Sequence, residues 1–394
     1  MTRLADRRRQ SYPVTGYLRQ RRMDGCDGSL CADRVPSDSC RASPTGADSD
    51  QYEGRHEDSG TDRAGDSGDG RPWWYVRGAP AADHGLRYRR RMGSTVPGID
   101  SGARQRLSAR FGSEVEAWFD ELPGRLTALA ERWQFELGSP IPRGSVSAVF
   151  RCRMADGRRA VLKASPDRVR LAIEAAALDA WHAVHTPAVI ALDEQLGALL
   201  IEAIEPGTPL VVSSIYPAAE SVAELLSSLH GNGVPDPSYP TVKQRVAYPF
   251  DSSAKLYERH PELTALIPPG RYERGRRLAT RLAQDDSPIV LLHGDLTPSN
   301  ILDGGAERGL VAIDPAPCLG DAAFDAVDLI LWQADDLETI EARTKRLAAA
   351  TDVDAQRLSG WCVGFAVMSA LELASQGNGP SAGIEALLEL ASQA

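Results

Sequence analysis

The stretch around which this chain is organised is Ile289-Val-Leu-Leu-His293-Gly294-Asp295-Leu-Thr-Pro-Ser-Asn300-Ile-Leu302, followed by a glycine-containing turn and Leu310-Val-Ala-Ile-Asp314-Pro315. Two short apolar runs each end in polar residues, which is typical of buried strands that lead into loops. If the two runs pair as a hairpin, Asp295, Asn300 and Asp314 lie close together. Carboxylate and amide oxygens in such an arrangement are suited to holding a metal ion and phosphate.

The composition indicates a globular protein. A length of 394 residues allows two or three domains, and a hydrophobic content of 42% is enough for a sizeable core. No window approaches about 18 uninterrupted apolar residues, and the N-terminus lacks the pattern of a signal peptide. We therefore expect a cytoplasmic protein that does not enter a membrane. The six cysteines show neither disulfide nor zinc spacing.

The net charge of −10 is unevenly distributed along the chain. Residues 1–91 contain 17 arginines, no lysine and 14 acidic residues, a net charge of +3, which leaves −13 for residues 92–394. An acidic body argues against nucleic acid as a partner and favours a cationic small molecule.

Residues 1–100 are rich in Arg, Asp, Gly and Ser and show almost no sustained apolar period. Such a segment cannot bury enough surface to offset the entropy of ordering, so we expect a disordered tail. A second hypothesis is that Met92 is the native start and that the preceding segment is upstream sequence read in frame. The excess of arginine without a single lysine is consistent with that hypothesis.

Residues 101–204 predict a smaller, sheet-rich lobe with leading helices. Apolar residues from Val115 to Trp133 recur at helical spacing, and Pro123 predicts a break into two short helices. A helix after Pro166 carries Glu174. Five strands are indicated, the first beginning at Phe135, the second around 146–153, and the others over 159–163, 189–192 and 198–204, with an Asp156-Gly157 turn after the second.

Residues 205–394 predict a larger, helical lobe, because Glu205-Pro206-Gly207 breaks the chain. Residues 235–270 are ambiguous and are interpreted as loop plus a helix. The other helical patterns cover 221–230, 271–284, 324–333, 337–350, 355–374 and 383–390.

Transfer of a phosphoryl group from ATP requires a group that takes the acceptor's proton, hard oxygen ligands for magnesium and cations for the triphosphate. Asp295 and Asn300 supply a carboxylate and an amide oxygen on one loop, and Asp314 supplies a second carboxylate. Lys163 ends a strand, and Glu174 on the next helix can pair with it. These five residues occur in the order that phosphoryl transfer enzymes use.

The motif His293-Gly294-Asp295-x-x-x-x-Asn300, followed by Ile313-Asp314-Pro315 and Gly320-Asp321-x-x-Phe324-Asp325, resembles the aminoglycoside phosphotransferase family, which is similar to protein kinases in fold. The phrase from Val311 to Pro317 most resembles the branch that contains streptomycin 6-kinases and hydroxyurea kinases. The resemblance covers roughly residues 105–390. It implies an α+β, bilobal, protein-kinase-like fold and ATP and Mg²⁺ as cofactors.

By matching position, the resemblance implies that Asp295 is the catalytic base, that Asn300 and Asp314 are magnesium ligands and that Lys163, paired with Glu174, contacts ATP phosphates. The turn with Gly144, Ser145 and Ser147 would cover the phosphates. It holds one glycine where a protein kinase has three, but serine hydroxyls and backbone N–H groups also bind phosphate. The backbone from Glu202 to Ile204 would face adenine.

Other polar residues near the motif are expected to support the loop or to bind substrate. His293 is expected to pack within the loop, and Asp325 to orient the loop and cap the helix that begins near it. The acidic residues Asp321, Asp328, Asp335, Asp336 and Glu338 resemble those that receive the cationic groups of an antibiotic, although each could equally be part of a solvated helix face.

The leading hypothesis is therefore an ATP- and Mg²⁺-dependent O-phosphotransferase, acting as a monomer on an aminoglycoside such as streptomycin and conferring resistance. A kinase of hydroxyurea or of another small metabolite hydroxyl is the first alternative. A catalytically silent nucleotide-binding regulatory protein is the second. A protein kinase is disfavoured because no activation segment ending in Ala-Pro-Glu follows Asp314.

Overall fold

The structure is a computed structural model that describes residues 99–142, 146–213, 215–377 and 380–394. The tail expected over residues 1–98 and the hypothesis about Met92 lie outside the described residues. So do Gly144 and Ser145 of the expected phosphate loop.

The first half of the described chain contains a five-stranded antiparallel sheet with the strand order β1-β2-β3-β5-β4. This confirms the expected sheet. Gly157 forms the turn between the second and third strands with φ +87°, a conformation that glycine adopts without strain. The strands are β1 (Phe135–Ile141), β2 (Ala148–Met154), β3 (Arg159–Ala164), β4 (Val189–Asp193) and β5 (Ala198–Glu202).

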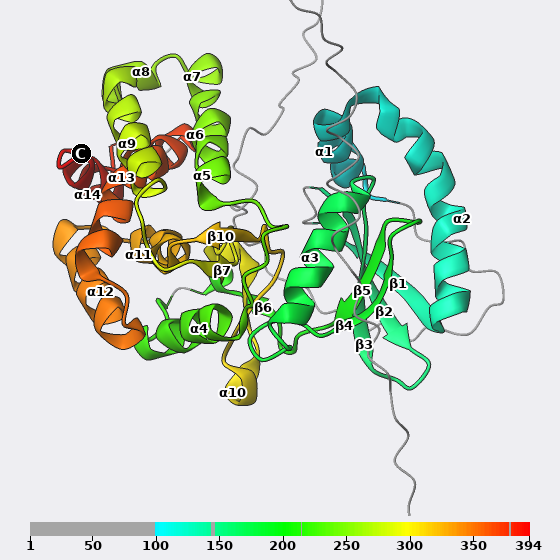
Figure 1. The fold of residues 1–394 in the computed structure, drawn as a ribbon. Coiled ribbons are helices and arrows are strands. Elements are labelled where there is room, and N and C mark those ends of the chain that lie inside the picture. Colours follow the sequence, from blue (N-terminus) through cyan, green and yellow to red (C-terminus); the bar gives the residue numbers. More distant parts are fainter. Residues whose placement is uncertain (1–98, 143–145, 214, 378–379) are drawn as a thin grey trace, which may run out of the picture. The chain divides into compact units, whose positions relative to one another are not determined.

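Helices cover both faces of this sheet, because successive side chains of a strand point to opposite faces. In β5, Leu200 packs with α1 (Ser101–Phe111) and α2 (Val115–Trp133), whereas Leu199 packs with α3 (Arg168–Ala180). Figure 1 shows α2 and α3 on opposite sides of the sheet. The inner strand β5 is therefore buried on both faces, whereas one face of β2 carries the exposed residues Arg151 and Arg153.

The expected break at Pro123 is wrong, because α2 continues through this residue. The break lies earlier, at a 3-10 turn over Gly112–Glu114. An internal proline costs a helix about 3 kcal/mol, but burying one large apolar side chain returns roughly 2 kcal/mol. Several buried side chains of α2 outweigh the proline: Trp118, Phe119, Leu122, Leu126 and Leu129.

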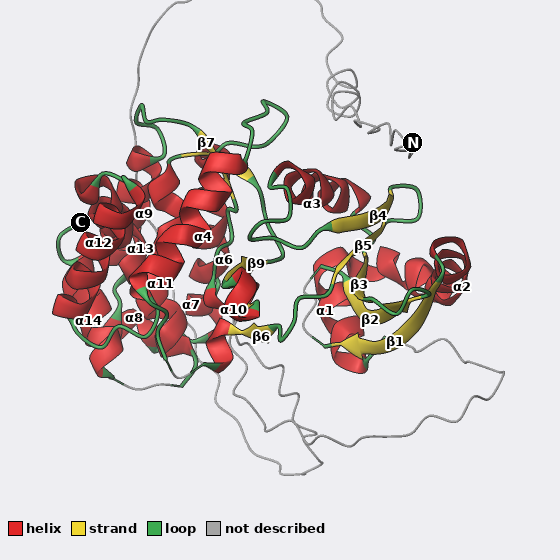
Figure 2. Cartoon of the chain, turned by 90° about the horizontal axis from the view of Figure 1, so that it is seen from below, coloured by secondary structure: helices red, strands yellow, loops and turns green. Residues whose placement is uncertain are grey.

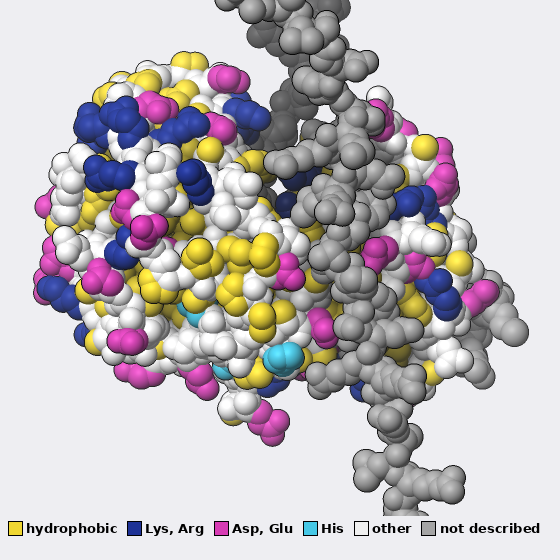
Figure 3. Space-filling view, in the orientation of Figure 1, with side chains coloured by type: hydrophobic (Ala, Val, Ile, Leu, Met, Phe, Trp, Pro, Cys, Tyr) yellow, Lys and Arg dark blue, Asp and Glu magenta, His cyan; other side chains and the backbone are white. Residues whose placement is uncertain are grey.

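The second half is mainly helical, as Figure 2 shows. The ambiguous residues 235–270 form short helices rather than one. The exposed face of α9 carries a row of arginines, and Figure 3 shows basic side chains gathered around α8 and α9. The helices are α4 (Ala219–Asn232), α5 (Val242–Arg245), α6 (Ala247–Ala254), α7 (Leu256–Arg259), α8 (Leu263–Leu266), α9 (Pro269–Leu282), α10 (Gly305–Arg308), α11 (Val327–Leu331), α12 (Leu337–Thr351), α13 (Ala355–Ser375) and α14 (Ala382–Ala391).

Helix α13 forms the centre of the helical half. In the described chain it is the one helix that is long and apolar enough to cross a membrane, but 67% of its most apolar window is buried inside the protein. It packs against α9 and α14, and its buried residues lie on all sides of the helix. A helix that is apolar all round is expected at the core of a large domain.

The stretch from 289 to 314 does not form the expected hairpin. Strand β7 (Val290–Leu292) pairs with β10 (Cys318–Gly320), and β9 (Leu310–Ala312) pairs with β8 (Ile301–Asp303), which also pairs with β6 (Thr208–Pro209). Only α10 lies between β8 and β9 in the sequence. Pairing these two strands therefore closes a shorter loop than the expected hairpin would, and a shorter loop costs less chain entropy. The loop from His293 to Asn300 therefore lies between two small sheets.

Candidate active site

The loop that contains Asp295 is held in place by the carboxylate of Asp325. The backbone N–H groups of His293 and Gly294 each donate to this carboxylate at 2.8 Å, and His230 Nε2 lies 3.1 Å from it. Burial alone raises the pKa of Asp325, but the hydrogen bond from His230 and the neighbouring charges outweigh burial and lower it. Asp325 is therefore ionised and fixes the entry to the loop.

His293 packs inside the loop as a neutral ring. Its Nε2–H donates to the Ile313 carbonyl at 3.0 Å, and Nδ1 faces the Asp295 N–H at 3.4 Å. The ring stacks on Trp181 at 6.1 Å between centroids. Burial lowers the pKa of His293, which favours the neutral form.

Asp295, Asn300 and Asp314 are brought together by hydrogen bonds. The Asn300 amide donates to the Asp295 carbonyl at 2.9 Å and to Asp295 Oδ2 at 3.1 Å. The Ile313 N–H donates to the Asn300 carbonyl at 2.8 Å, which brings Asp314 alongside. Both of these hydrogen bonds are made by the amide nitrogen of Asn300. Its amide oxygen, Oδ1, is therefore left to bind a cation. The Asp314 side chain is 47% exposed and is accessible from solvent.

Lys163 joins the two halves of the described chain. Its ammonium group forms ion pairs with Glu174 and with Asp314. The side chains of Lys163 and Glu174 are each only 5% exposed. Burial alone would lower the pKa of Lys163, but the two carboxylates outweigh it and raise the pKa. Lys163 is thus a permanently charged ammonium group beside Asp314.

The pKa of Asp295 is raised well above its ordinary value. Burial is the largest cause, and the charge of Asp328 adds to it. The pKa of Asp328 is itself raised to about 6 by burial and by Asp325. A carboxylate with a raised pKa binds a proton more readily, which suits a group that accepts one.

The residues expected to face adenine, from Glu202 to Ile204, differ in which of their groups already form hydrogen bonds. The Glu202 carboxylate accepts from Arg308 at 2.8 Å and from the Ala188 N–H at 3.1 Å, so this side chain is occupied within the chain. The backbone N–H and carbonyl of Ile204 have no hydrogen-bond partner among the described residues. Ser147, from the turn expected to cover the phosphates, is buried.

Of the five acidic residues expected to bind substrate, Glu338 is exposed in the first turn of α12, and the other four lie in different environments. Asp321 is buried and fully engaged: it accepts from Arg357 Nε at 2.6 Å, from Trp361 Nε1 at 2.7 Å and from the Ala323 N–H at 3.1 Å. It caps the helical turn Ala322–Ala326, so the cap expected of Asp325 belongs to Asp321.

Among the other three, Asp336 is exposed and caps α12, with the Thr339 N–H donating to its Oδ1 at 2.6 Å. Asp335 is also exposed. Asp328 is half-buried beside Asp295, and its carboxylate forms no hydrogen bond with a described residue. Asp328 is the one of the four that combines an unoccupied carboxylate with a position near Asp295.

Sequence reasoning missed several residues that build this site, namely His230, Trp181, Arg308, Arg357 and Trp361. Each lies at least 30 positions from the residue that it supports. Of these residues, only His230 stands out in the local sequence, because it ends a helical pattern directly before Gly231-Asn-Gly233.

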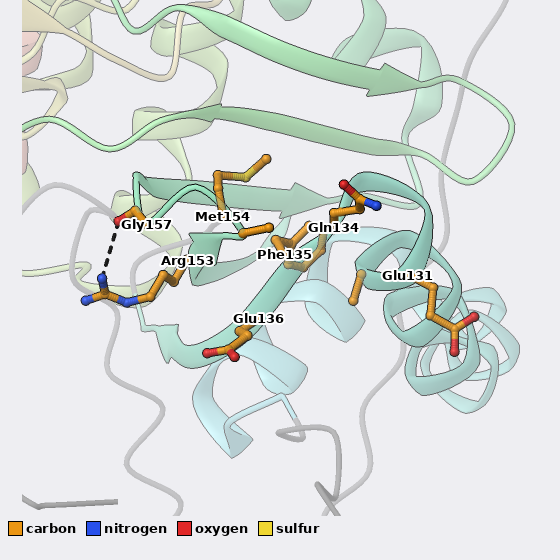
Figure 4. A pocket seen from close by; sticks show the side chains of 9 residues that line it. Glu131, Gln134, Phe135, Glu136, Arg153, Met154 and Gly157 are labelled. Carbon is orange, nitrogen blue, oxygen red and sulfur yellow. Dashed lines mark hydrogen bonds between the residues drawn. The ribbon is translucent and has the colours of Figure 1, made fainter. Parts of the chain in front are cut away.

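Two cavities of the described chain lie away from these residues. One, of about 520 Å³, lies at the edge of the sheet and is lined by residues such as Glu131, Glu136 and Arg153, as Figure 4 shows. The other, of about 560 Å³, includes Glu202, Ala203 and Arg308 on its wall. Neither is lined by Asp295, Asn300 or Asp314.

Comparison with known proteins identifies the family to which the chain belongs. A family model described as aminoglycoside/hydroxyurea antibiotic resistance kinase matches residues 132–377, more than half of the chain. The streptomycin 6-kinase of Streptomyces griseus is 28% identical over 278 residues, which cover 67% of this chain and 86% of that protein. The hydroxyurea phosphotransferase of Kitasatospora aureofaciens is 28% identical over 274 residues, which cover 67% and 77%.

A solved structure of a choline kinase from Streptococcus pneumoniae is similar with a TM-score of 0.46 and 15% identity, over 68% of this chain and 95% of that chain. The family match covers the sheet, the Lys163 and Glu174 pair and the loop of Asp295. The chain belongs to the aminoglycoside/hydroxyurea antibiotic resistance kinase family and is a small-molecule O-phosphotransferase.

Proposed function

We propose that this chain uses ATP and Mg²⁺ to phosphorylate a hydroxyl group of a cationic aminoglycoside such as streptomycin, and thereby confers resistance. The observation that carries the proposal is the contact between Asp295 and Asn300, with Asp314 and Lys163 adjoining it. These groups meet the requirements of in-line phosphoryl transfer.

In this mechanism the acceptor hydroxyl lies against Asp295. Its oxygen forms a bond to the terminal phosphorus of ATP as the bond from that phosphorus to the bridging oxygen breaks, and ADP leaves with the electron pair. Asp295 accepts the hydroxyl proton, which its raised pKa favours. The Asn300 amide orients Asp295 through its hydrogen bond to Oδ2.

The residues present fit a magnesium ion. Mg²⁺ commonly takes one or two protein oxygens and completes its shell with water and substrate phosphate. The Oδ1 of Asn300 and the half-exposed Asp314 carboxylate are such oxygens. No group of three or more His, Cys, Asp or Glu side chains suited to a metal occurs in the described chain. When bound, Mg²⁺ neutralises phosphate charge. Lys163, already beside Asp314, is placed to contact the phosphates.

Asp328 favours a cationic acceptor over hydroxyurea, which is neutral. It is a half-buried carboxylate next to Asp295 that forms no hydrogen bond with a described residue. A guanidinium or ammonium group would satisfy it. The net charge of the chain body has the matching sign. A cytoplasmic location and a monomeric state stay predictions from the sequence.

The role of Asp295 is tested by Asp295→Asn, assayed for phosphate transfer to streptomycin and for MgATP binding. We expect kcat to fall by about 10²- to 10⁴-fold, because proton acceptance is lost, while nucleotide binding remains. Asp286→Asn, an exposed aspartate nine positions earlier, is the matched control. If Asp295→Asn keeps near-full activity, Asp295 is not the base.

The acceptor is tested with labelled ATP and a panel of streptomycin, other aminoglycosides and hydroxyurea. Transfer to hydroxyurea and none to streptomycin would establish the alternative suggested by the second relative. MgATP binding without transfer to any acceptor would favour a catalytically silent nucleotide-binding protein.

A further inference from the structure

Two arginines near Asp295 have no partner in the described chain. Arg170 lies in the first turn of α3, and Arg245 ends α5. Both side chains are half-buried, and neither guanidinium group forms a hydrogen bond or an ion pair with a described residue. Half-buried arginines usually bind a carboxylate, as Arg357 and Arg308 do here.

The helix geometry places Arg170 over the Lys163 site. Arg170 and Glu174 are four positions apart on α3, so their side chains share one face of the helix. Glu174 on that face binds Lys163, which binds Asp314. Consistently, the charge of Arg170 lowers the pKa values of Glu174, Asp314 and Asp295.

Arg245 approaches from the helical half. Thr241, which caps α5, forms a bridge with Leu319 of β10, and β10 pairs with β7, the strand that leads into the Asp295 loop. One turn further along α5, Arg245 lies close enough for its charge to lower the pKa values of Asp295 and Cys318. The two arginines therefore approach Asp295 from different halves of the chain.

Two half-buried guanidinium groups without a counter-ion in the described chain leave room for an anionic ligand at this site. The terminal group of a triphosphate brings several negative charges. Arginine suits that group, since its planar fork binds phosphate oxygens in pairs.

We propose that Arg170 and Arg245 bind the terminal phosphoryl group of ATP, the group that is transferred. This inference rests on the proposed phosphotransferase function and assigns two contacts beyond Lys163 and the metal ligands. Because the contacts are to the terminal group, they distinguish ATP from ADP. They also stabilise the charge of the group during transfer.

The test compares MgATP and MgADP binding by calorimetry for the full chain and for Arg170→Gln, Arg245→Gln and the double variant. We expect each single variant to weaken MgATP binding about 10-fold and to leave MgADP binding within about 2-fold, since a charge-assisted contact to phosphate is worth roughly that factor. In the transfer assay, kcat should fall about 10²-fold.

Exposed basic residues of the same two helices provide the matched controls, Arg168→Gln and Lys243→Gln, which should change neither constant. Arg170→Lys guards against misfolding and should recover part of the MgATP affinity. Equal weakening of MgATP and MgADP, or no change in either, overturns the inference while the proposed function stands. Failure of the unaltered chain to bind MgATP overturns both.

Discussion

Replacing Lys163 by Met separates the structural role of this lysine from its role in binding phosphate. The change leaves Glu174, only 5% exposed, without its cation, whereas Asp314 is 47% exposed and is solvated by water. Removing one partner of a buried ion pair costs about 3–5 kcal/mol. For a protein of this size we expect the melting temperature to fall by on the order of 10 °C.

The pH dependence of Lys163→Met has a definite sign. Burial raises the pKa of Glu174 above its unfolded value, so the folded variant binds a proton that the unfolded chain releases. The stability of the variant should therefore increase as the pH is lowered from 8 towards the unfolded pKa of about 4.3, and fall as the pH rises through the folded pKa. Thermal melts across this range measure the effect. Lys345→Met, whose side chain is 78% exposed, is the control and should change little.

The double variant Lys163→Met, Glu174→Gln completes the test. Removing the carboxylate charge should restore most of the lost stability, while kcat stays reduced by about 10²-fold because no ammonium group contacts the phosphates. The reasoning is refuted if the double variant is no more stable than Lys163→Met, or if either variant transfers phosphate at the normal rate.

Three further predictions concern the loop and its surroundings. Asp321→Asn should lower the melting temperature, because it weakens charge-assisted hydrogen bonds worth about 1.5–3 kcal/mol, and should leave the KM for the acceptor unchanged. A raised KM with normal stability would instead support its expected role in substrate binding. Gly294→Ala should destabilise the loop and abolish activity, since φ is +74° and the new Cβ would lie 2.2 Å from the Ala316 carbonyl oxygen. Activity equal to that of the unaltered chain would contradict this. The acid limb of the kcat/KM profile should lie above the pH expected for an ordinary aspartate, and Asp328→Asn should move it to lower pH, because the charge of Asp328 raises the pKa of Asp295. A limb that Asp328→Asn leaves in place would refute that coupling.

The sequence was informative wherever a structural feature depends on neighbouring residues. The spacing of five between Asp295 and Asn300 places both on one loop, and the strand pattern around the Asp156-Gly157 turn determines an antiparallel pair. The helical patterns over 221–230, 271–284, 337–350, 355–374 and 383–390 were also located correctly, because amphipathic periodicity is a local property. The short helices within 235–270 were not resolved from the sequence. The expected break at Pro123 failed because long-range packing outweighed a local penalty.

The sequence by itself determined which chemical groups are present and which of them share a loop, since backbone geometry over a few residues follows from the residues themselves. Only the tertiary structure decided which groups are free to act. Asp321 accepts hydrogen bonds from Arg357 and Trp361, which lie 36 and 40 positions away in the sequence. The side chains of Asp328, Arg170 and Arg245, which lie around Asp295, form no hydrogen bond with any described residue. The physical reason is that a side chain's partners and its burial are set by contacts between distant segments, and these determine its charge and its availability.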